Sequence, residues 1–506
     1  MMTINSKTSH LSQFEEYTEE LMLLRSVLST LSWDQETMMP VKGGNFRAKQ
    51  IASLSALFHQ KLTSPSLGDL LKHLQDADLE LWAQAAVREI NRERDKALRL
   101  PERLVRDLAE TTSLAYEIWV QARGQSDWSL FSPWLEKILR LKREEARCLQ
   151  ESDSLYDALL DHYEPGMTVQ MLDPLFAVVR PRLTQLLSQI QSSGKQVSED
   201  VFKGHFPAAQ QKNLGRQVLS AMGFQWEAGR LDRSPHPFCT GLSPLDVRIT
   251  TRYSEDDFAS SLFGIIHEGG HALYEQGLGS QHYGSAACDA ISLGIHESQS
   301  RLWENQVGRS RAFWEYWFPH LKESFPGQLD HIPLDTLVQG INRVEASLIR
   351  VEADEVSYGL HIILRYELEK LMIEGELEVS DLEAAWNATM EEYLGVVPSN
   401  AAEGVLQDIH WSHGSLGYFP TYLLGNLYAG QIFHQANQAM PGLEDDIRQG
   451  NFLALREWLR QEIHQRAKTV TAETLIHDIS HEPLSPHYFL DYLEDKFNHL
   501  YELHGS

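Results

Sequence analysis

One short stretch, GIIHEGGHALYEQ at residues 264–276, has the residue types and spacing of a catalytic metal site. His267 and His271 are four residues apart, so in a helix their imidazoles lie one turn apart on the same face. Both can therefore bind one metal ion, while Glu268, about 100° around the helix, can hold a water molecule beside it and act as general base. The pattern predicts metal-assisted hydrolysis.

A catalytic metal site needs a third protein ligand and one open coordination position. Glu297, in the run GIHESQSRLWEN, is the best candidate, although His296 competes for the role and a surface carboxylate is the alternative interpretation. In a neighbouring zincin pattern, an acidic residue one turn after the third ligand supports a metal-bound histidine. Here Arg301 occupies that position, so the sequence does not identify the residues that orient the histidines.

Two adjacent glycines, Gly269 and Gly270, lie between the histidines of this motif. Each costs a helix roughly 1 kcal/mol relative to alanine. Such a cost is explained where another group must approach the helix closely. The sequence leaves open whether that group is the backbone of a substrate or a neighbouring strand.

The elements that must position these residues are mostly helices. Apolar residues at three- and four-residue spacing predict helices over 14–31, 50–75, 78–97, 101–124, 130–163, 170–193 and 208–223. Between residues 226 and 253, prolines, glycines and an alternating run predict a loop followed by one or two short strands. We expect a mainly α fold, one large multi-lobed domain with a small β element, with a helical lobe at 1–225 and the metal-binding part at 226–506.

Composition limits the partners of the chain. Its 506 residues include 71 acidic and 44 basic ones, and the resulting formal charge of −27 repels nucleic acid and anionic membranes. No apolar run approaches the roughly 20 residues that a membrane-spanning helix needs. The first residues lack the pattern of a secretory signal, and the three distant cysteines do not form a disulfide framework. We therefore expect a cytoplasmic protein without nucleic acid or membrane partners.

Taken together in their order, several motifs resemble those of the carboxypeptidase Taq family of metallocarboxypeptidases, distantly akin to the neurolysin-like and angiotensin-converting helical zincins. The matching segments are WDQETMMP (33–40), YDALLDHYEPGMT (156–168), HPF (236–238), DVRIT (246–250), HEGGH (267–271), GIHESQSRLWEN (294–305), RVEADE (350–355) and GVLQDIHWSHGSLGYFPTYLLGN (404–426).

This resemblance implies a mostly helical fold with a deep active-site groove. It also implies one divalent metal ion per chain, release of single residues from the carboxyl termini of peptides, and a homodimer. Two histidines and a glutamate suit zinc, and they also accept cobalt or manganese. Zinc is the ion we expect.

A carboxypeptidase must bind a terminal carboxylate, and the planar fork of an arginine can do so with two parallel hydrogen bonds. Arg350 and Arg248 are the candidates. Arg350 lies in an acidic run, so a salt-bridge network on a helix surface is the alternative interpretation. The resemblance favours Arg350 as the anchor, and it implies that His236 reaches the substrate backbone beside the metal.

The stretch DIHWSHGSLGYFPTY concentrates hydrogen-bond donors in a glycine-rich turn before a helix. His410, Tyr422 and Tyr418, in that order of preference, are candidates for stabilising the oxyanion that forms during peptide hydrolysis. Taken singly, each is more often a packed aromatic or a core histidine. Only convergence on the HEGGH helix would favour the catalytic interpretation.

Two other functions remain open at this point. An endopeptidase or dipeptidase would use the same metal site with a different groove. A helical binding or scaffold protein would hold a structural or vestigial metal in a closed four-ligand site, whereas the sequence offers three good ligands and an intact Glu268.

Overall fold

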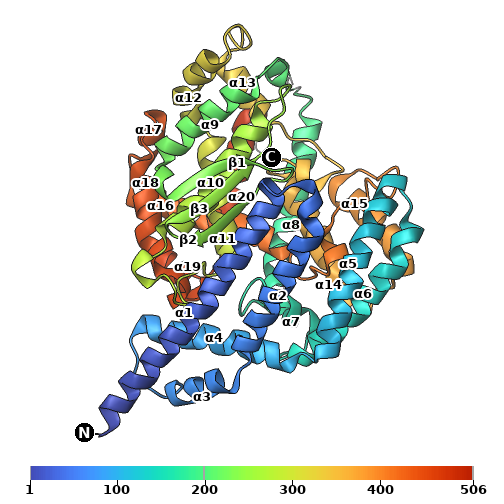
Figure 1. The fold of residues 1–506 in the computed structure, drawn as a ribbon. Helices are drawn as coiled ribbons and strands as arrows, with labels where there is room; N and C mark the ends of the chain where they lie inside the picture. Colours follow the sequence, from blue (N-terminus) through green and yellow to red (C-terminus); the bar gives the residue numbers. More distant parts are fainter. Residues whose placement is uncertain (1, 196, 198–199, 504–506) are drawn as a thin grey trace.

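The protein, described here by a computed structural model covering residues 2–195, 197 and 200–503, is a single mainly helical domain (Figure 1). The helices before the sheet are α1 (Met2–Thr37), α2 (Gly44–Leu62), α3 (Pro65–Leu74), α4 (Leu81–Arg99), α5 (Glu102–Gln125), α6 (Trp128–Leu149), α7 (Leu155–Leu160), α8 (Val169–Ser192) and α9 (Ala208–Met222). The range predicted as one helix over 50–75 is divided in two, because Pro65 begins a new helix that Ser64 caps.

The sheet is followed by α10 (Ala259–Gly277), α11 (Leu293–Arg301), α12 (Arg311–Ser324), α13 (Leu334–Ile341), α14 (Ser357–Glu374), α15 (Leu382–Leu394), α16 (Pro420–Ala439), α17 (Leu443–Arg448), α18 (Leu453–Glu462), α19 (Ala472–Ser480) and α20 (His487–Tyr501). A π-helix, η5 (Leu302–Gly308), continues directly from α11. Across the described ranges, none of the helices combines the length and the apolar character that a bilayer crossing requires.

The small sheet has three strands, β1 (Gly229–Arg233), β2 (Cys239–Ser243) and β3 (Asp246–Thr251), in the order β1-β3-β2. β1 is parallel to β3, and β2 is antiparallel to it. The sequence predicts one or two strands here and misses β1, because only one of its side chains, Leu231, is buried and no alternation is visible. The helix α1 runs beside this sheet, where the Ser26 hydroxyl donates to the Leu242 carbonyl at 3.0 Å (Figure 1).

Two hydrophobic cores hold the domain together. The larger one extends from Ala115 to Tyr501 and includes residues on both sides of position 225. The smaller one joins α1, α3 and α4, together with Leu62 at the end of α2, to Ala286 and Ala287 in the connection between α10 and α11. The division of the chain into a helical lobe and a metal-binding part at residue 225 stays a prediction.

The helices α10 and α11 pack unusually closely, and the glycines of the HEGGH motif make this possible. A Cβ on Gly270 would lie 2.5 Å from the Gln299 carbonyl oxygen and 2.7 Å from the Ser300 Cα, both in α11. A Cβ on Gly269 would lie 2.5 Å from Leu219 of α9. The groups that approach these glycines are therefore neighbouring helices, and neither a strand nor a substrate is needed to explain them.

We predict that Gly270→Ala lowers the free energy of unfolding by roughly 1–3 kcal/mol, because the new methyl group meets backbone atoms that cannot move independently. The matched control is Gly264→Ala in the same helix, where a Cβ would meet only the Thr251 hydroxyl at 3.7 Å. That change should be neutral or stabilising by up to about 1 kcal/mol. Urea unfolding followed by circular dichroism measures both, and equal effects of the two substitutions would contradict the close approach.

Candidate metal centre and active site

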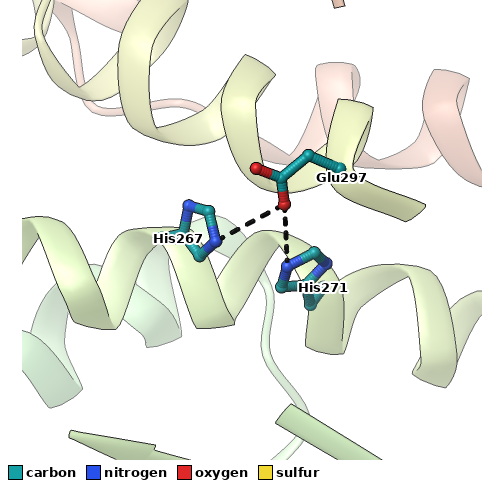
Figure 2. A group of neighbouring side chains, drawn as sticks. All are labelled: His267, His271 and Glu297. Carbon is teal, nitrogen blue, oxygen red and sulfur yellow. Dashed lines mark ion pairs between the residues drawn. The ribbon is translucent and has the colours of Figure 1, made fainter. Parts of the chain in front are cut away.

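The side chains of His267, His271 and Glu297 converge between two facing helices (Figure 2). α10 carries both histidines, and α11 carries the glutamate, whose carboxylate points between the two imidazoles. The Glu297 Oε2 atom lies 3.7 Å from the Nε2 atom of His267 and 3.4 Å from that of His271. The three residues that the sequence predicts as metal ligands thus form one compact cluster.

The dimensions of this cluster suit a divalent ion. One nitrogen from each histidine and one carboxylate oxygen lie within 4.8 Å of one another. Ligand atoms about 2.0–2.1 Å from a tetrahedral zinc ion lie roughly 3.3 Å from each other. The two distances from the Glu297 oxygen to the histidine nitrogens, 3.7 and 3.4 Å, are close to this value. Three donors of this kind leave one coordination position open, as catalytic sites require.

Each imidazole is oriented by a hydrogen bond from its other nitrogen. The Nδ1 of His267 donates to the Glu304 carboxylate at 2.8 Å, and the Nδ1 of His271 donates to the His296 carbonyl at 3.1 Å. Both Nε2 lone pairs are therefore free to bind a metal. The His296 ring stacks on His271 and bonds to Glu275 at 2.8 Å, so it points away from the candidate ligand cluster.

Glu304 is a site residue that the sequence analysis missed. The acidic support is expected one turn after Glu297, but it lies seven residues after it, in the π-helix η5, whose wider turn changes which side chains face α10. Arg301, at the expected position, joins both carboxylates: its Nε donates to Glu297 Oε1 at 2.7 Å, and its Nη1 lies 3.3 Å from Glu304. Burial would raise the pKa of Glu304, but the His267 bond and Arg301 hold it well below its ordinary value.

Glu268, the candidate general base, is buried beside the histidines on α10. Burial raises the pKa of its carboxyl group to about 7. A base whose pKa lies near the working pH accepts and returns protons readily. The buried environment of Glu268 therefore suits a carboxyl group that exchanges a proton, and not one that stays ionised.

Arg350 is buried and does not belong to a salt-bridge network on a helix surface. The interpretation that it pairs with the acidic residues next to it in the sequence is therefore wrong. Its Nε and Nη2 donate to Oδ1 of Asp408 at 2.9 and 2.8 Å. Arg365, fully buried, binds Oδ2 of the same carboxylate at 2.6 Å. Two guanidinium groups thus share one carboxylate, which holds the pKa of Asp408 well below its ordinary value in spite of its burial.

The three candidates for oxyanion stabilisation form one aromatic cluster. His410 lies in the 3₁₀-helix η8 (His410–His413), and its Nε2 is 3.3 Å from the Tyr422 hydroxyl in the first turn of α16. The Tyr418 ring lies 5.2 Å from that of Tyr422 and 5.4 Å from that of His410. Burial lowers the pKa of His410 to about 4, so this imidazole is neutral at physiological pH.

A continuous chain of contacts joins the candidate metal centre to Arg350 and this cluster. Arg301, bound to Glu297, lies over the ring of Tyr358 at 4.6 Å. The Tyr358 hydroxyl lies 3.5 Å from Nη1 of Arg350, whose guanidinium lies 5.2 Å from the Tyr422 ring. In addition, a Cβ on Gly425, one turn after Tyr422, would lie 2.4 Å from Glu297, so α16 packs directly against the third candidate ligand.

The other two predicted substrate residues lie at the sheet. Arg248 on β3 bonds to Asp246 at 2.8 and 2.9 Å and stacks over Trp33 of α1 at 4.4 Å. His236 is exposed in the loop between β1 and β2, and within the described ranges its side chain forms no hydrogen bond or ion pair. Their roles toward a substrate stay predictions.

Residues 13–497 match the family profile of the carboxypeptidase Taq (M32) metallopeptidases. The chain belongs to this family. It is 44% identical to thermostable carboxypeptidase 1 of Thermus thermophilus over 96% of this chain and 98% of the relative, and 38% identical to carboxypeptidase 1 of Bacillus subtilis over 97% of each. The solved M32 carboxypeptidase of Deinococcus radiodurans R1 superposes with a TM-score of 0.95 at 35% identity, covering 98% of this chain and all of that one.

The protein is therefore a metallocarboxypeptidase that acts on peptides and uses a divalent metal ion. This excludes the alternative of a helical scaffold protein.

Glu304→Gln keeps the shape of the side chain and removes its charge. We predict that it weakens metal binding roughly 10- to 100-fold, because the His267 ring loses a charged acceptor that orients it. A competition titration with a chromophoric chelator measures the affinity. Glu315→Gln, a carboxamide change on a surface ion pair with Arg448, is the control and should leave the affinity unchanged. Unchanged affinity in Glu304→Gln would show that this carboxylate does not support the site.

Proposed function

We propose that this protein is a zinc-dependent carboxypeptidase that removes single residues of broad type from the free carboxyl terminus of peptides, with the ion held by His267, His271 and Glu297. One observation carries the proposal. A buried positive charge without a matching carboxylate lies next to the candidate metal centre, in the cluster of Arg350, Arg365 and Asp408.

The charge balance of this cluster favours an incoming carboxylate. Two guanidinium groups and one carboxylate leave a net charge of +1 in a buried position, and buried charges normally have partners. Another buried carboxylate, Glu369, is close enough to feel the charge of Arg365, but its hydrogen bonds come from Tyr156, Trp411 and the backbone of Gly417 and not from either guanidinium. Burial raises its pKa to about 7. The terminal carboxylate of a peptide is the natural counterion for Arg350, and binding it places the last peptide bond toward the metal.

In this proposal each residue of the site has its own part in the hydrolysis. A bound zinc ion supplies a Lewis acid that polarises the scissile carbonyl and makes water more acidic. Glu268 accepts the proton of the attacking water and passes it to the leaving amine. Tyr422, with His410 beside its hydroxyl and Tyr418 packed on its ring, donates to the oxyanion. Arg350 holds the terminal carboxylate, so only the last bond is aligned for attack.

The sequence resemblance is the support for three further parts of the proposal. We infer that the protein acts in the cytoplasm, that it forms a homodimer, and that Arg248 and His236 contact the substrate after it binds. The deep groove expected from the family would hold the rest of the peptide. An endopeptidase or dipeptidase with the same metal centre is the outcome that the following experiment separates from a carboxypeptidase.

We predict that Arg350→Ala reduces kcat/KM for free-acid peptides roughly 10- to 100-fold, mainly through KM, because charge-assisted hydrogen bonds to the substrate are lost. The same peptides with an amidated carboxyl terminus, which we expect to be poor substrates of the wild type, should lose much less. Circular dichroism and thermal unfolding check that the buried substitution leaves the fold intact.

Arg248→Ala is the matched comparison, because Arg248 is the other arginine considered for the anchor. It should leave the ratio of free-acid to amidated cleavage unchanged. Equal losses on both substrates for Arg350→Ala, or a wild type that cleaves both forms equally, would argue for an endopeptidase and against the anchor.

A further inference from the structure

Tyr358 occupies the space between the metal centre and the proposed carboxylate anchor. It lies in the first turn of α14, with Arg301 over its ring at 4.6 Å and Nη1 of Arg350 at 3.5 Å from its hydroxyl. Its ring also meets that of Tyr422 edge to face at 6.2 Å. A substrate whose carbonyl lies at the metal and whose carboxylate lies at Arg350 must therefore pass beside this hydroxyl.

The Tyr358 hydroxyl has an unused donor. It accepts one long hydrogen bond from Arg350, and among the residues that the structure describes no acceptor takes its own proton. Two other buried tyrosines do have an acceptor, since Tyr156 donates to Glu369 at 2.8 Å and Tyr366 donates to Asp173 at 2.6 Å. Tyr274 and Tyr501 resemble Tyr358 in only accepting, but their donors are backbone N–H groups and not an arginine. A buried hydroxyl normally finds an acceptor. Because an arginine lies beside this one, an anionic acceptor from outside the chain suits the position.

The free edge of the Arg350 guanidinium faces the same point. Arginine has five N–H donors, and Asp408 occupies the edge formed by Nε and Nη2. The edge that contains Nη1 remains, and it is the edge beside the Tyr358 hydroxyl. A carboxylate bound on this edge therefore comes within reach of the hydroxyl as well.

We propose that Tyr358 is a substrate-binding residue whose hydroxyl donates a hydrogen bond to the terminal carboxylate of the peptide. Arg350 and Tyr358 then bind that carboxylate together. This inference rests on the proposed function of Arg350. The two cations at Arg301 and Arg350 on either side of the phenol favour an anion at its hydroxyl. Burial raises the pKa of Tyr358, so the hydroxyl keeps its proton and remains a donor.

Tyr358→Phe tests this role, because it removes only the hydroxyl and keeps the ring under Arg301. With the metal-loaded enzyme, KM for a free-acid peptide should rise roughly tenfold with kcat nearly unchanged, as expected for one lost hydrogen bond to a charged group. Cleavage of the amidated peptide should not change. Tyr366→Phe, in the same helix but bonded to Asp173, is the matched control and should leave both substrates unaffected.

A double substitution separates a direct contact from an effect through Arg350. In the Arg350→Ala background, Tyr358→Phe should reduce free-acid cleavage further, because the hydroxyl still touches the substrate. No further loss there would mean that Tyr358 only holds Arg350, and it would overturn the proposal. A fall in kcat on both substrates would overturn it too, because it would assign the hydroxyl to the scissile carbonyl.

The same measurements distinguish failure of this inference from failure of the proposed function. A wild type that does not prefer free-acid peptides would contradict the proposed function, whatever Tyr358 does. A wild type that prefers them, together with a Tyr358→Phe variant that keeps the same KM values, would contradict the role of Tyr358 alone.

Discussion

The buried carboxylate of Glu297 is the group on which the rest of the candidate active centre depends. One oxygen faces His267 and His271, the other accepts from Arg301, and its side chain packs against Gly425. A carboxylate in such a position needs several polar partners, because burial without them is costly. Three helices, α10, α11 and α16, therefore have to pack within a few ångströms of one another at this point. Glycines in α10 and α16 permit that approach.

Local spacing in the sequence predicts a large part of this arrangement. The mostly helical fold follows from three- and four-residue periodicity, and the interval from His267 to His271 places both imidazoles on one helical face. The support of His267 by Glu304 could not be predicted in the same way. The prediction assumes that α-helical spacing continues after Glu297, but the chain forms a π-helix from Leu302 onward. The acidic residue that supports His267 is therefore the seventh after Glu297 and not the fourth. β1 is missed for a different reason, since it buries too little to show a pattern.

Contacts between distant parts of the sequence account for the other differences. The partner of Arg350 is Asp408, 58 residues away, although acidic residues adjoin Arg350 in the sequence. Only the fold brings Arg365 to the same carboxylate, and only then does an excess positive charge become visible. This excess positive charge connects the hydrolysis to one particular bond of the peptide. In the proposed function, the candidate metal centre accounts for the cutting of a peptide bond, and the unmatched charge beside it accounts for the choice of the last one.

The order in which products appear from a free-acid peptide tests this link most directly. Time-resolved mass spectrometry would follow one peptide with the zinc-loaded enzyme, with the chelated enzyme, and with a Glu268→Gln variant that still binds metal. We expect successive losses of single residues from the carboxyl terminus, which stop on chelation, return on adding zinc, and are absent in Glu268→Gln. Internal fragments, dipeptide steps, or cleavage that persists without metal would contradict a metal centre paired with a carboxylate anchor.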